Sequence, residues 1–338
     1  YKRQIKARAK ADKKVIVLPE TEDRRTYEAT AQILKEGIAD VVLVGSEEAI
    51  KKGSEGLDIS GAKIVDPATS EKTQGYIDKL VELRSKKGMT PEQAKEILLN
   101  QYLYYGVMMV KMGDADGMVS GACHSTADTL RPCLQILKTK PGTKLVSAFF
   151  LMVVPDCEYG ANGTFVFADS GLNQNPNPEE LAAIAASSAE SFKLLVEEEP
   201  VVAMLSHSTK GSAKHADVDK VVEATRIAKE QNPDLKLDGE FQLDAAIVPS
   251  VGASKAPGSE VAGKANTLIF PDLDAGNIGY KLVQRLAKAE AYVFPVPVAL
   301  ISNALFSPAS YIFCRLLINP VCMEFGCNRY ASNDGICS

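Results

Sequence analysis

The sequence predicts an α/β protein of two domains. Its 338 residues exceed one ordinary domain and suit two of about 150 residues each. Short β-branched apolar runs alternate with helical patterns, first over residues 14–44 and again from residue 144. An apolar fraction of 46% and a charged fraction of 24% are typical of globular domains. We therefore expect one α/β domain over residues 1–143 and a second over 144–298.

The first domain opens with a predicted βαβ unit. An apolar run is followed by Pro19 and an acidic turn, then by a helical pattern closed by Gly37, and then by a second apolar run. Thr90 and Pro91 have the residue types of an N-cap and a first helical position. The expected strands are 14–18, 40–44 and 116–121, and the expected helices are 24–35, 70–86, 91–112 and 126–138.

The second domain repeats this alternation. The expected strands are 145–154, 164–167, 201–205 and 267–270, and the expected helices are 178–195, 218–229 and 278–288. The pattern changes after Tyr292, because residues 293–322 hold a single charge, Arg315, and four prolines. No clean helix or strand fits there. A membrane span is the less favoured reading, since Pro308 and several polar residues interrupt the apolar stretch.

Composition and charge narrow the function classes. A net charge of -5 with mixed signs provides no basic field for nucleic acid. No CxxC pair occurs, and Cys123, Cys133 and Cys157 are far apart, so no metal-binding pattern is predicted and a reducing compartment is expected. Residues 1–14 lack the apolar core of a secretory signal. We expect a cytoplasmic protein without membrane partners.

The strongest candidate site is Ser120-Gly-Ala-Cys-His-Ser-Thr-Ala-Asp-Thr-Leu-Arg131, between a predicted strand end and a helix. Backbone N–H groups at a helix N-terminus, the helix dipole and the hydroxyls of Ser125 and Thr126 suit a phosphate. Arg131 lies within the first turns of that helix and could reach the same anion. The alternative is ordinary helix capping, for which Ser and Thr are equally suited.

Cys123 and His124 lie inside this turn. His124 could act as a general base and Cys123 as a nucleophile. A structural role is favoured for both, because a lone histidine in a turn is more often a hydrogen-bonding residue and a cysteine without a basic partner behaves as a small buried hydrophobe.

A second polar loop follows the strand expected at 201–205. It contains Ser206, Ser208, Thr209 and Lys210 beside Gly211, residue types that suit a phosphate or diphosphate. The GxxxxGK spacing of nucleoside triphosphatases is absent. A plain surface loop is the alternative reading.

Acidic residues follow this loop. They are Asp238, Glu240, Asp244, Asp272 and Asp274. Paired carboxylates can hold a metal ion, but solvated helix ends explain such residues as well, and no ligand spacing requires a metal. No metal is predicted.

Several motifs together resemble phosphate acetyltransferase. They are Leu18-Pro-Glu20, residues 116–128 with Arg131-Pro132, Phe167-Ala-Asp169 with residues 173–176, residues 204–211, Leu237-Asp-Gly-Glu240 and residues 261–266 through Gly276-Asn-Ile-Gly-Tyr280. They occur in order and at fitting spacings from residue 1 to about 292.

The resemblance implies a reaction and an architecture. Acetyl phosphate and coenzyme A would give acetyl-CoA and inorganic phosphate by direct thiolate attack in a ternary complex, with coenzyme A as a substrate and no cofactor. The fold implied is a homodimer of chains with two α/β/α domains, similar to isocitrate and isopropylmalate dehydrogenases, with the active site in the cleft between domains. Residues from about 299 to 338 would return to the first domain.

The resemblance also assigns residues. Ser125, Thr126 and Arg131 match the family's phosphate-binding turn, Arg84 matches an arginine tied to catalysis or substrate binding, and Arg285 matches one associated with coenzyme A. Each is a substrate-binding candidate. The cationic side chains suit an acyl phosphate, which needs charge stabilisation as phosphate departs.

The likeness ends after Tyr292. The family's Asn-Asp-Leu-Ser-Arg-Gly segment and the aspartate base that follows it are absent, and Asp334 has neither the position nor the context to replace that base. A shifted reading frame is the favoured explanation, ahead of a divergent terminus. The catalytic residues are therefore unknown, and we expect impaired activity.

Three other functions are weighed against this one. A phosphate butyryltransferase is the nearest enzymatic alternative, and a non-catalytic phosphate- or coenzyme A-binding module is the alternative from another class. A dehydrogenase of related fold is less favoured, because the sequence has no Rossmann glycine fingerprint.

Overall fold

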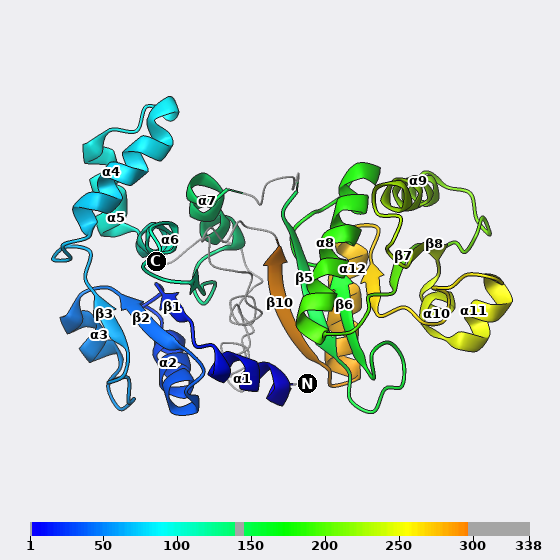
Figure 1. Ribbon diagram of the computed structural model, residues 1–338, viewed down its shortest axis with the longest axis horizontal. Coiled ribbons are helices and arrows are strands. Elements are labelled where there is room, and N and C mark those ends of the chain that lie inside the picture. The colour runs from blue at the N-terminus through cyan, green and yellow to red at the C-terminus, as the bar shows by residue number, and fades with distance from the viewer. Residues whose placement is uncertain (1, 139–144, 297–338) are drawn as a thin grey trace, which may run out of the picture. The chain divides into compact units, whose positions relative to one another are not determined.

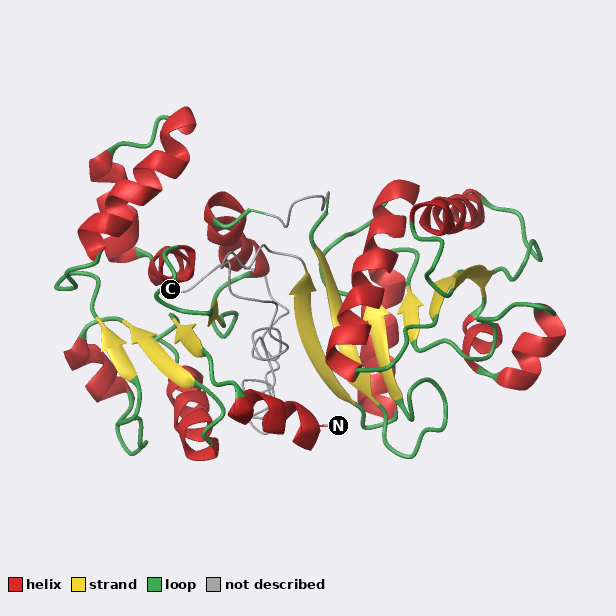
Figure 2. Cartoon of the chain, in the orientation of Figure 1, coloured by secondary structure: helices red, strands yellow, loops and turns green. Residues whose placement is uncertain are grey.

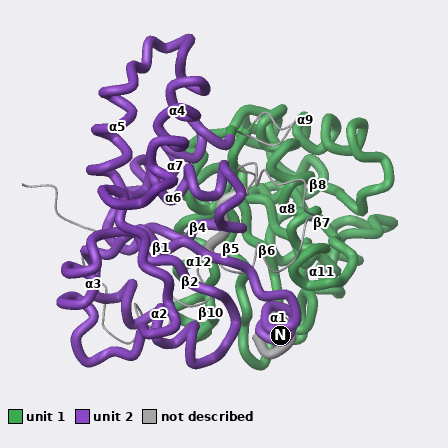
Figure 3. The backbone as a smooth tube through the Cα atoms, turned by 60° about the vertical axis from the view of Figure 1, so that its left-hand side comes forward, with its two compact units in different colours: residues 1, 138–299 green, residues 2–137, 300–338 purple. Residues whose placement is uncertain are grey.

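The structure is a computed structural model that describes residues 2–138 and 145–296. It divides into two compact units, one holding the described residues 2–137 and the other the described residues from 138 onward (Figure 3). Both units combine helices with a central sheet, as Figure 2 shows. The α/β class predicted from the sequence is confirmed.

The unit of residues 2–137 has a parallel four-stranded sheet in the order β3-β2-β1-β4 (Figure 1). Its strands are β1 (Val15–Leu18), β2 (Asp40–Val44), β3 (Lys63–Val65) and β4 (Gly117–Met118). Its helices are α1 (Lys2–Ala11), α2 (Arg24–Glu36), α3 (Glu47–Gly53), α4 (Thr73–Arg84), α5 (Pro91–Asn100), α6 (Tyr102–Lys111) and α7 (Thr126–Ile136), with a 3-10 turn, η1 (Ser85–Lys87), after α4. Because β1 and β4 are parallel neighbours, the loops that leave their carboxyl ends meet at one edge.

The predicted βαβ unit is confirmed. Val15 of β1 pairs with Asp40 of β2 in parallel register, and α2 connects the two strands. Gly37 ends α2 with a left-handed φ of 66°, a backbone conformation that glycine adopts without strain. Ile16, Leu18, Val41 and Leu43 contribute to the buried core of this unit.

Two predictions for this unit need correction. The helix expected over 91–112 is two helices, since Gln101 has an extended backbone (φ -123°, ψ 90°) that ends α5 and begins α6. The strand expected over 116–121 is limited to β4, because the backbone N–H groups of Gly121, Ala122 and Cys123 bind the carboxylate of Glu20 instead of a neighbouring strand. The elements β3, α1 and α3 were not predicted from the sequence.

The second unit has a mixed six-stranded sheet in the order β10-β5-β6-β9-β7-β8. Its strands are β5 (Ser147–Val153), β6 (Thr164–Ala168), β7 (Val202–Leu205), β8 (Leu237–Phe241), β9 (Thr267–Ile269) and β10 (Glu290–Val296). Its helices are α8 (Pro178–Val196), α9 (Ala216–Gln231), α10 (Leu243–Ile247), α11 (Pro249–Lys255) and α12 (Leu273–Leu286). The strands β6, β9, β7 and β8 run parallel, and β5 is antiparallel to both of its neighbours.

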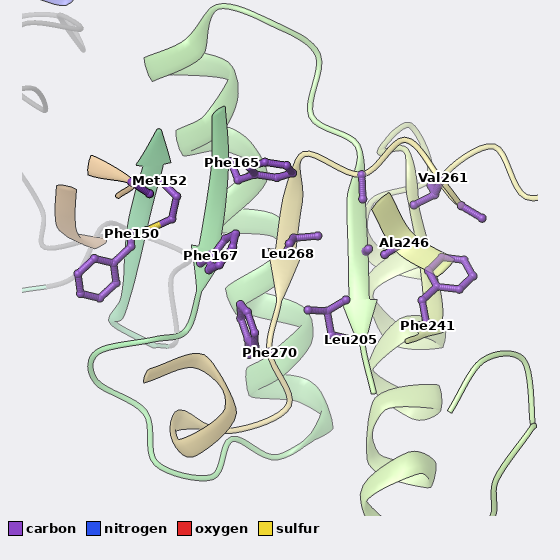
Figure 4. Packing of buried hydrophobic residues seen from close by; sticks show 14 of the residues in the cluster. Phe150, Met152, Phe165, Phe167, Leu205, Phe241, Ala246, Val261, Leu268 and Phe270 are labelled. Atoms are coloured by element: carbon purple, nitrogen blue, oxygen red, sulfur yellow. The ribbon is translucent and has the colours of Figure 1, made fainter. Parts of the chain in front are cut away.

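Alternate residues of these strands form the core shown in Figure 4. Phe150, Phe167, Leu268 and Phe270 point to the same side of the sheet, where Tyr280 of α12 packs against them. Successive strand residues face opposite sides of a sheet, so the residues in between lie on the other face, which α8 covers. The phenyl ring of Phe150 stacks on the ring of Tyr280 with centroids 3.7 Å apart.

Two strands of this unit were not predicted. β10 extends through Tyr292 into the segment where no strand was expected, and it pairs antiparallel with β5. It stands at an edge of the described sheet, where a proline such as Pro295 is tolerated because one side of the strand needs no ladder bond. β8 was missed because Asp238 and Glu240 interrupt its apolar pattern. The tail predictions for 297–338 lie outside the described residues.

Within residues 2–138 and 145–296, no helix combines the length and the apolarity needed to cross a bilayer.

Candidate functional site

A buried carboxylate organises the turn that follows β4. Glu20, 2% exposed, accepts hydrogen bonds from four consecutive backbone N–H groups, those of Gly121, Ala122, Cys123 and His124, at 2.7, 2.7, 3.1 and 3.0 Å. Burial raises the pKa of Glu20, but the hydrogen bonds with the backbone of Ala122, Cys123 and His124 and with the His124 ring lower it by more, so the net shift of the pKa is downward. The ionised side chain therefore fixes the conformation of the turn.

Ser125 caps the helix that follows the turn. Its Oγ accepts a hydrogen bond from the Asp128 N–H at 3.2 Å and donates one to Asp128 Oδ2 at 2.6 Å. Thr126 is the first residue of α7, and its side chain lies outside the described atoms. The capping role that the sequence left as an alternative is thus the one Ser125 performs in this structure.

Arg84 and Arg131 both lie near Tyr104, although 47 positions separate them in the sequence. Both charges act on the phenol of Tyr104 in α6: burial raises the pKa of Tyr104, and the two arginines oppose that rise. The Tyr104 hydroxyl donates to Gln135 of α7 at 3.0 Å. The C-terminal end of α4 and the first turns of α7 therefore place two cations around one phenol.

Neither arginine is strongly neutralised. Arg131 has an exposed ion pair with Asp128 at 3.5 Å, and 59% of its side chain is exposed. The Nε of Arg84 is buried and has no hydrogen-bond partner among the described residues. A buried donor without a partner is costly, so this nitrogen has capacity for an additional acceptor.

His124 and Cys123 have different surroundings. His124 Nδ1 lies 2.9 Å from Glu20 Oε1, so His124 serves as a hydrogen-bonding residue of the turn. Cys123 is exposed, contrary to the expectation of a buried hydrophobe. Partial burial of its sulfur and the carboxylates of Glu20, Glu22 and Asp23 raise the pKa of Cys123 far above its usual range. A protonated thiol is a poor nucleophile, which argues against the nucleophile reading.

The loop after β7 satisfies its polar groups internally. Ser206 Oγ accepts from the Ser208 N–H at 3.2 Å, and Ser208 donates through its own Oγ to Glu240 Oε1 at 2.9 Å. Thr209 Oγ1 accepts from the Gln242 N–H at 2.9 Å. Lys210 Nζ forms an ion pair with Asp238 Oδ1 at 2.8 Å. This arrangement matches the plain-loop alternative, because its cation is already paired.

Protein partners bind four of these acidic residues: Asp238, Glu240, Asp244 and Asp272. Asp238 binds Lys210, Lys229 and Ser259; burial raises the pKa of Asp238, and these contacts lower it to about 2. Asp238 and Glu240 lie on β8, so they are not helix-end residues as one reading of the sequence suggested. The remaining contacts are the Asp244 ion pair with Lys255 and the Asp272 cap of α12.

Arg285 lies in the unit from residue 138 onward, exposed in the last turn of α12.

Within the described part of the chain, one group of three side chains has the spacing of metal ligands: Glu20, Cys123 and His124. The sequence could not show it, because Glu20 and Cys123 are 103 positions apart. The parallel pairing of β1 with β4 joins them.

Comparison with known proteins identifies the family. The model of the family described as "Phosphate acetyl/butaryl transferase" matches residues 1–294. The phosphate acetyltransferase of Acetivibrio thermocellus is 61% identical over 289 residues, covering 86% of this chain and 87% of that protein. That of Thermoanaerobacterium thermosaccharolyticum is 60% identical over 284 residues, covering 84% and 86%.

A comparison with solved structures gives the same family. The phosphotransacetylase of Streptococcus pyogenes superposes with a TM-score of 0.79 at 45% identity, covering 86% of this chain and 88% of that one. The match extends over both units, and the resemblance predicted from the sequence is confirmed. The chain belongs to the phosphate acetyl/butyryl transferase family.

Proposed function

We propose that this chain is a phosphate acetyltransferase that transfers acetyl between acetyl phosphate and coenzyme A. The observation that carries the proposal is the pair of weakly neutralised arginines, Arg84 and Arg131, near Tyr104. An acyl phosphate is a dianion whose oxygens such guanidinium groups bind in a bidentate manner. Family membership supplies the substrate class.

The phosphate end of the site is proposed to consist of these arginines with Ser125 and Thr126. Arg131 exchanges its exposed contact with Asp128 for a phosphate oxygen, and Arg84 Nε acquires the acceptor it lacks. Ser125 and Thr126 contribute N–H groups at the start of α7, where the helix dipole favours an anion.

The reaction is a direct transfer and needs no cofactor. The coenzyme A thiolate sulfur bonds to the acetyl carbonyl carbon, negative charge develops on the carbonyl oxygen, and the bond from that carbon to the bridging phosphate oxygen breaks. Acetyl-CoA and inorganic phosphate result. The two guanidinium groups stabilise the charge on the departing phosphate.

Coenzyme A is proposed to bind through Arg285, whose exposed side chain can reach a ligand phosphate. The finer description of the fold as α/β/α domains of dehydrogenase type stays part of the proposal, as does a cytoplasmic location. A homodimer is also proposed. Ile278, Leu282 and Leu286 are 58, 52 and 79% exposed at four-residue spacing on α12, an apolar stripe suited to a second subunit.

Reduced activity is part of the proposal. The thiol must lose its proton, and the sequence after Tyr292 lacks the aspartate and the Ser-Arg pair that the resemblance associates with this step. Loss of a positioned general base costs about 10²–10⁴ in rate.

Thioester formation from acetyl phosphate and coenzyme A tests the proposal. We expect coenzyme A-dependent formation at a rate about 10²–10⁴ below that of the Acetivibrio thermocellus relative measured in parallel. Equal rates would contradict the impairment, and absence of both turnover and acetyl phosphate binding would contradict the function. Coenzyme A binding without turnover would favour the non-catalytic module. Butyryl phosphate is the comparison substrate, since the family includes butyryl transfer.

A further inference from the structure

Two loops at the carboxyl edge of the parallel sheet bring metal-ligand side chains together. Glu20 and Glu22 follow β1, and Cys123 and His124 follow β4. Cys123 Sγ lies 3.5 Å from His124 Nδ1 and 3.7 Å from Glu20 Oε1, and Nδ1 lies 2.9 Å from the same Oε1. Three different ligand atoms therefore form one small triangle.

The triangle has the size of one face of a tetrahedral metal site. Zinc bonds of about 2.3 Å to sulfur and about 2.0–2.1 Å to nitrogen and oxygen place ligand atoms about 3.3–3.6 Å apart. The two distances from sulfur, 3.5 and 3.7 Å, match, and the 2.9 Å distance needs a shift of about 0.4 Å. We propose that Glu20, Cys123 and His124 bind a divalent ion of the Zn²⁺ class, a site that goes beyond the acyl-transfer function.

Groups around the triangle would orient the ligands. With Nδ1 bound to the ion, the ring proton of His124 is on Nε2, which lies 3.6 Å from Glu22 Oε1. A carboxylate on the far ring nitrogen is the usual orienting partner of a metal-bound histidine. Glu20 is held by its four backbone N–H donors, and metal-binding carboxylates are commonly hydrogen-bonded in this way.

The local charge favours a cation. Three carboxylates, those of Glu20, Glu22 and Asp23, lie near the thiol, and Arg25 follows them in the first turn of α2. Arg25 is paired with Asp23 at 2.6 Å and also donates to the Ala122 carbonyl. Within the described residues, the carboxylates of Glu20 and Glu22 have no ion pair with an arginine. A metal ion would compensate them and would displace the thiol proton, as thiolate ligands require.

The exposure of the site and the chemical types of its ligands indicate which ion it binds. Cys123 is exposed and His124 is 35% exposed, so an ion can enter from solution. One thiolate, one imidazole and one carboxylate suit Zn²⁺ and Co²⁺, whereas Mg²⁺ and Ca²⁺ require oxygen ligands. The bound ion would link the loop after β1 to the loop after β4.

Cobalt titration of the full chain tests the site. Cys314, Cys322, Cys327 and Cys337 are first changed to serine, so that a thiolate band cannot come from them. Co²⁺ should then give a thiolate-to-cobalt charge-transfer band that saturates at one equivalent. Cys123→Ser should abolish the band, while Cys133→Ser and Cys157→Ser, the other described cysteines, should retain it. No band, or a band that survives Cys123→Ser, overturns the proposal.

Zinc competition gives a second readout. Zn²⁺ should displace Co²⁺ and raise the midpoint of thermal unfolding in the four-serine background, because an ion that binds the folded state stabilises it. His124→Gln should remove this rise, and Glu22→Gln should weaken affinity about 10–100-fold as an orienting residue does. Circular dichroism establishes that each variant is folded. An unchanged Zn²⁺ effect in folded His124→Gln would exclude the histidine as a ligand and overturn the site.

Discussion

The turn after β4 and the loop after β7 share a sequence pattern but differ in how their charges are compensated. Each follows a parallel strand and combines glycine, hydroxyls and a basic residue. In the loop after β7, Lys210 is paired with Asp238, and Ser208 is bonded to Glu240. Around the turn after β4, Arg84 Nε has no partner within the described chain, and Arg131 has a 3.5 Å exposed contact. The proposed anion site therefore differs from the loop after β7 in its unneutralised cations and not in its sequence pattern.

The largest expected effect is a loss of ligand binding when the arginines near the turn after β4 are changed, with no such loss when the lysine of the loop after β7 is changed. The double variant Arg84→Gln/Arg131→Gln should weaken acetyl phosphate binding at least about 10²-fold, because each charged hydrogen bond contributes about 1.5–3 kcal/mol. Calorimetric titration measures the affinity. Lys210→Gln is the matched control and should change it less than about twofold, as an already paired cation contributes little. A comparable loss in Lys210→Gln would reverse the assignment of the two loops.

Loss of the hydrogen bonds within the loop after β7 should lower the stability of the protein and not its affinity for ligand. Glu240 is 3% exposed and accepts from Ser208 Oγ at 2.9 Å and from the Gly211 N–H at 2.7 Å. Glu240→Ala leaves both donors without this acceptor and should lower the free energy of unfolding by about 2–3 kcal/mol. Urea denaturation measures it, with the exposed Glu198→Ala as the control. A loss below about 0.5 kcal/mol would mean that Glu240 does not hold the loop.

The two regions also show which features sequence reasoning can reach. The strand at Val15–Leu18 and the helix that Gly37 ends are local signals, and both were predicted. Other features join residues that lie 28 to 104 positions apart. They are the hydrogen bonds of Glu20 with the turn after β4, the placement of Arg84 and Arg131 near one tyrosine, and the ion pair of Lys210 with Asp238. Periodicity cannot show which charges neutralise each other across a sheet. The sequence therefore located both loops correctly but could not distinguish them.

Acid should weaken the loop after β7 through Asp238. The pKa of Asp238 is lowered to about 2 in the folded chain from its ordinary value of 3.8. A lowered folded-state pKa stabilises the protein above the unfolded-state value, and that stabilisation is lost as pH falls toward 2. Asp238→Asn should cost about 1–2 kcal/mol above pH 4, and the difference from the original chain should shrink between pH 4 and pH 2. A pH-independent difference over this range would contradict the charge pairing.

The smallest effect concerns whether Ser125 is a cap, a ligand or both. Ser125→Ala removes the cap of α7 and should lower the free energy of unfolding by about 1 kcal/mol. Ser46→Ala is the matched control, because Ser46 caps α3 with the same geometry, its Oγ accepting from the Ala49 N–H at 3.3 Å. Both variants should lose similar stability, but Ser125→Ala alone should also weaken phosphate binding, by about two- to tenfold for one hydrogen bond. Equal phosphate affinity in the two variants would leave Ser125 with its capping role, and the anion site would then consist of the two arginines and the backbone N–H groups of α7.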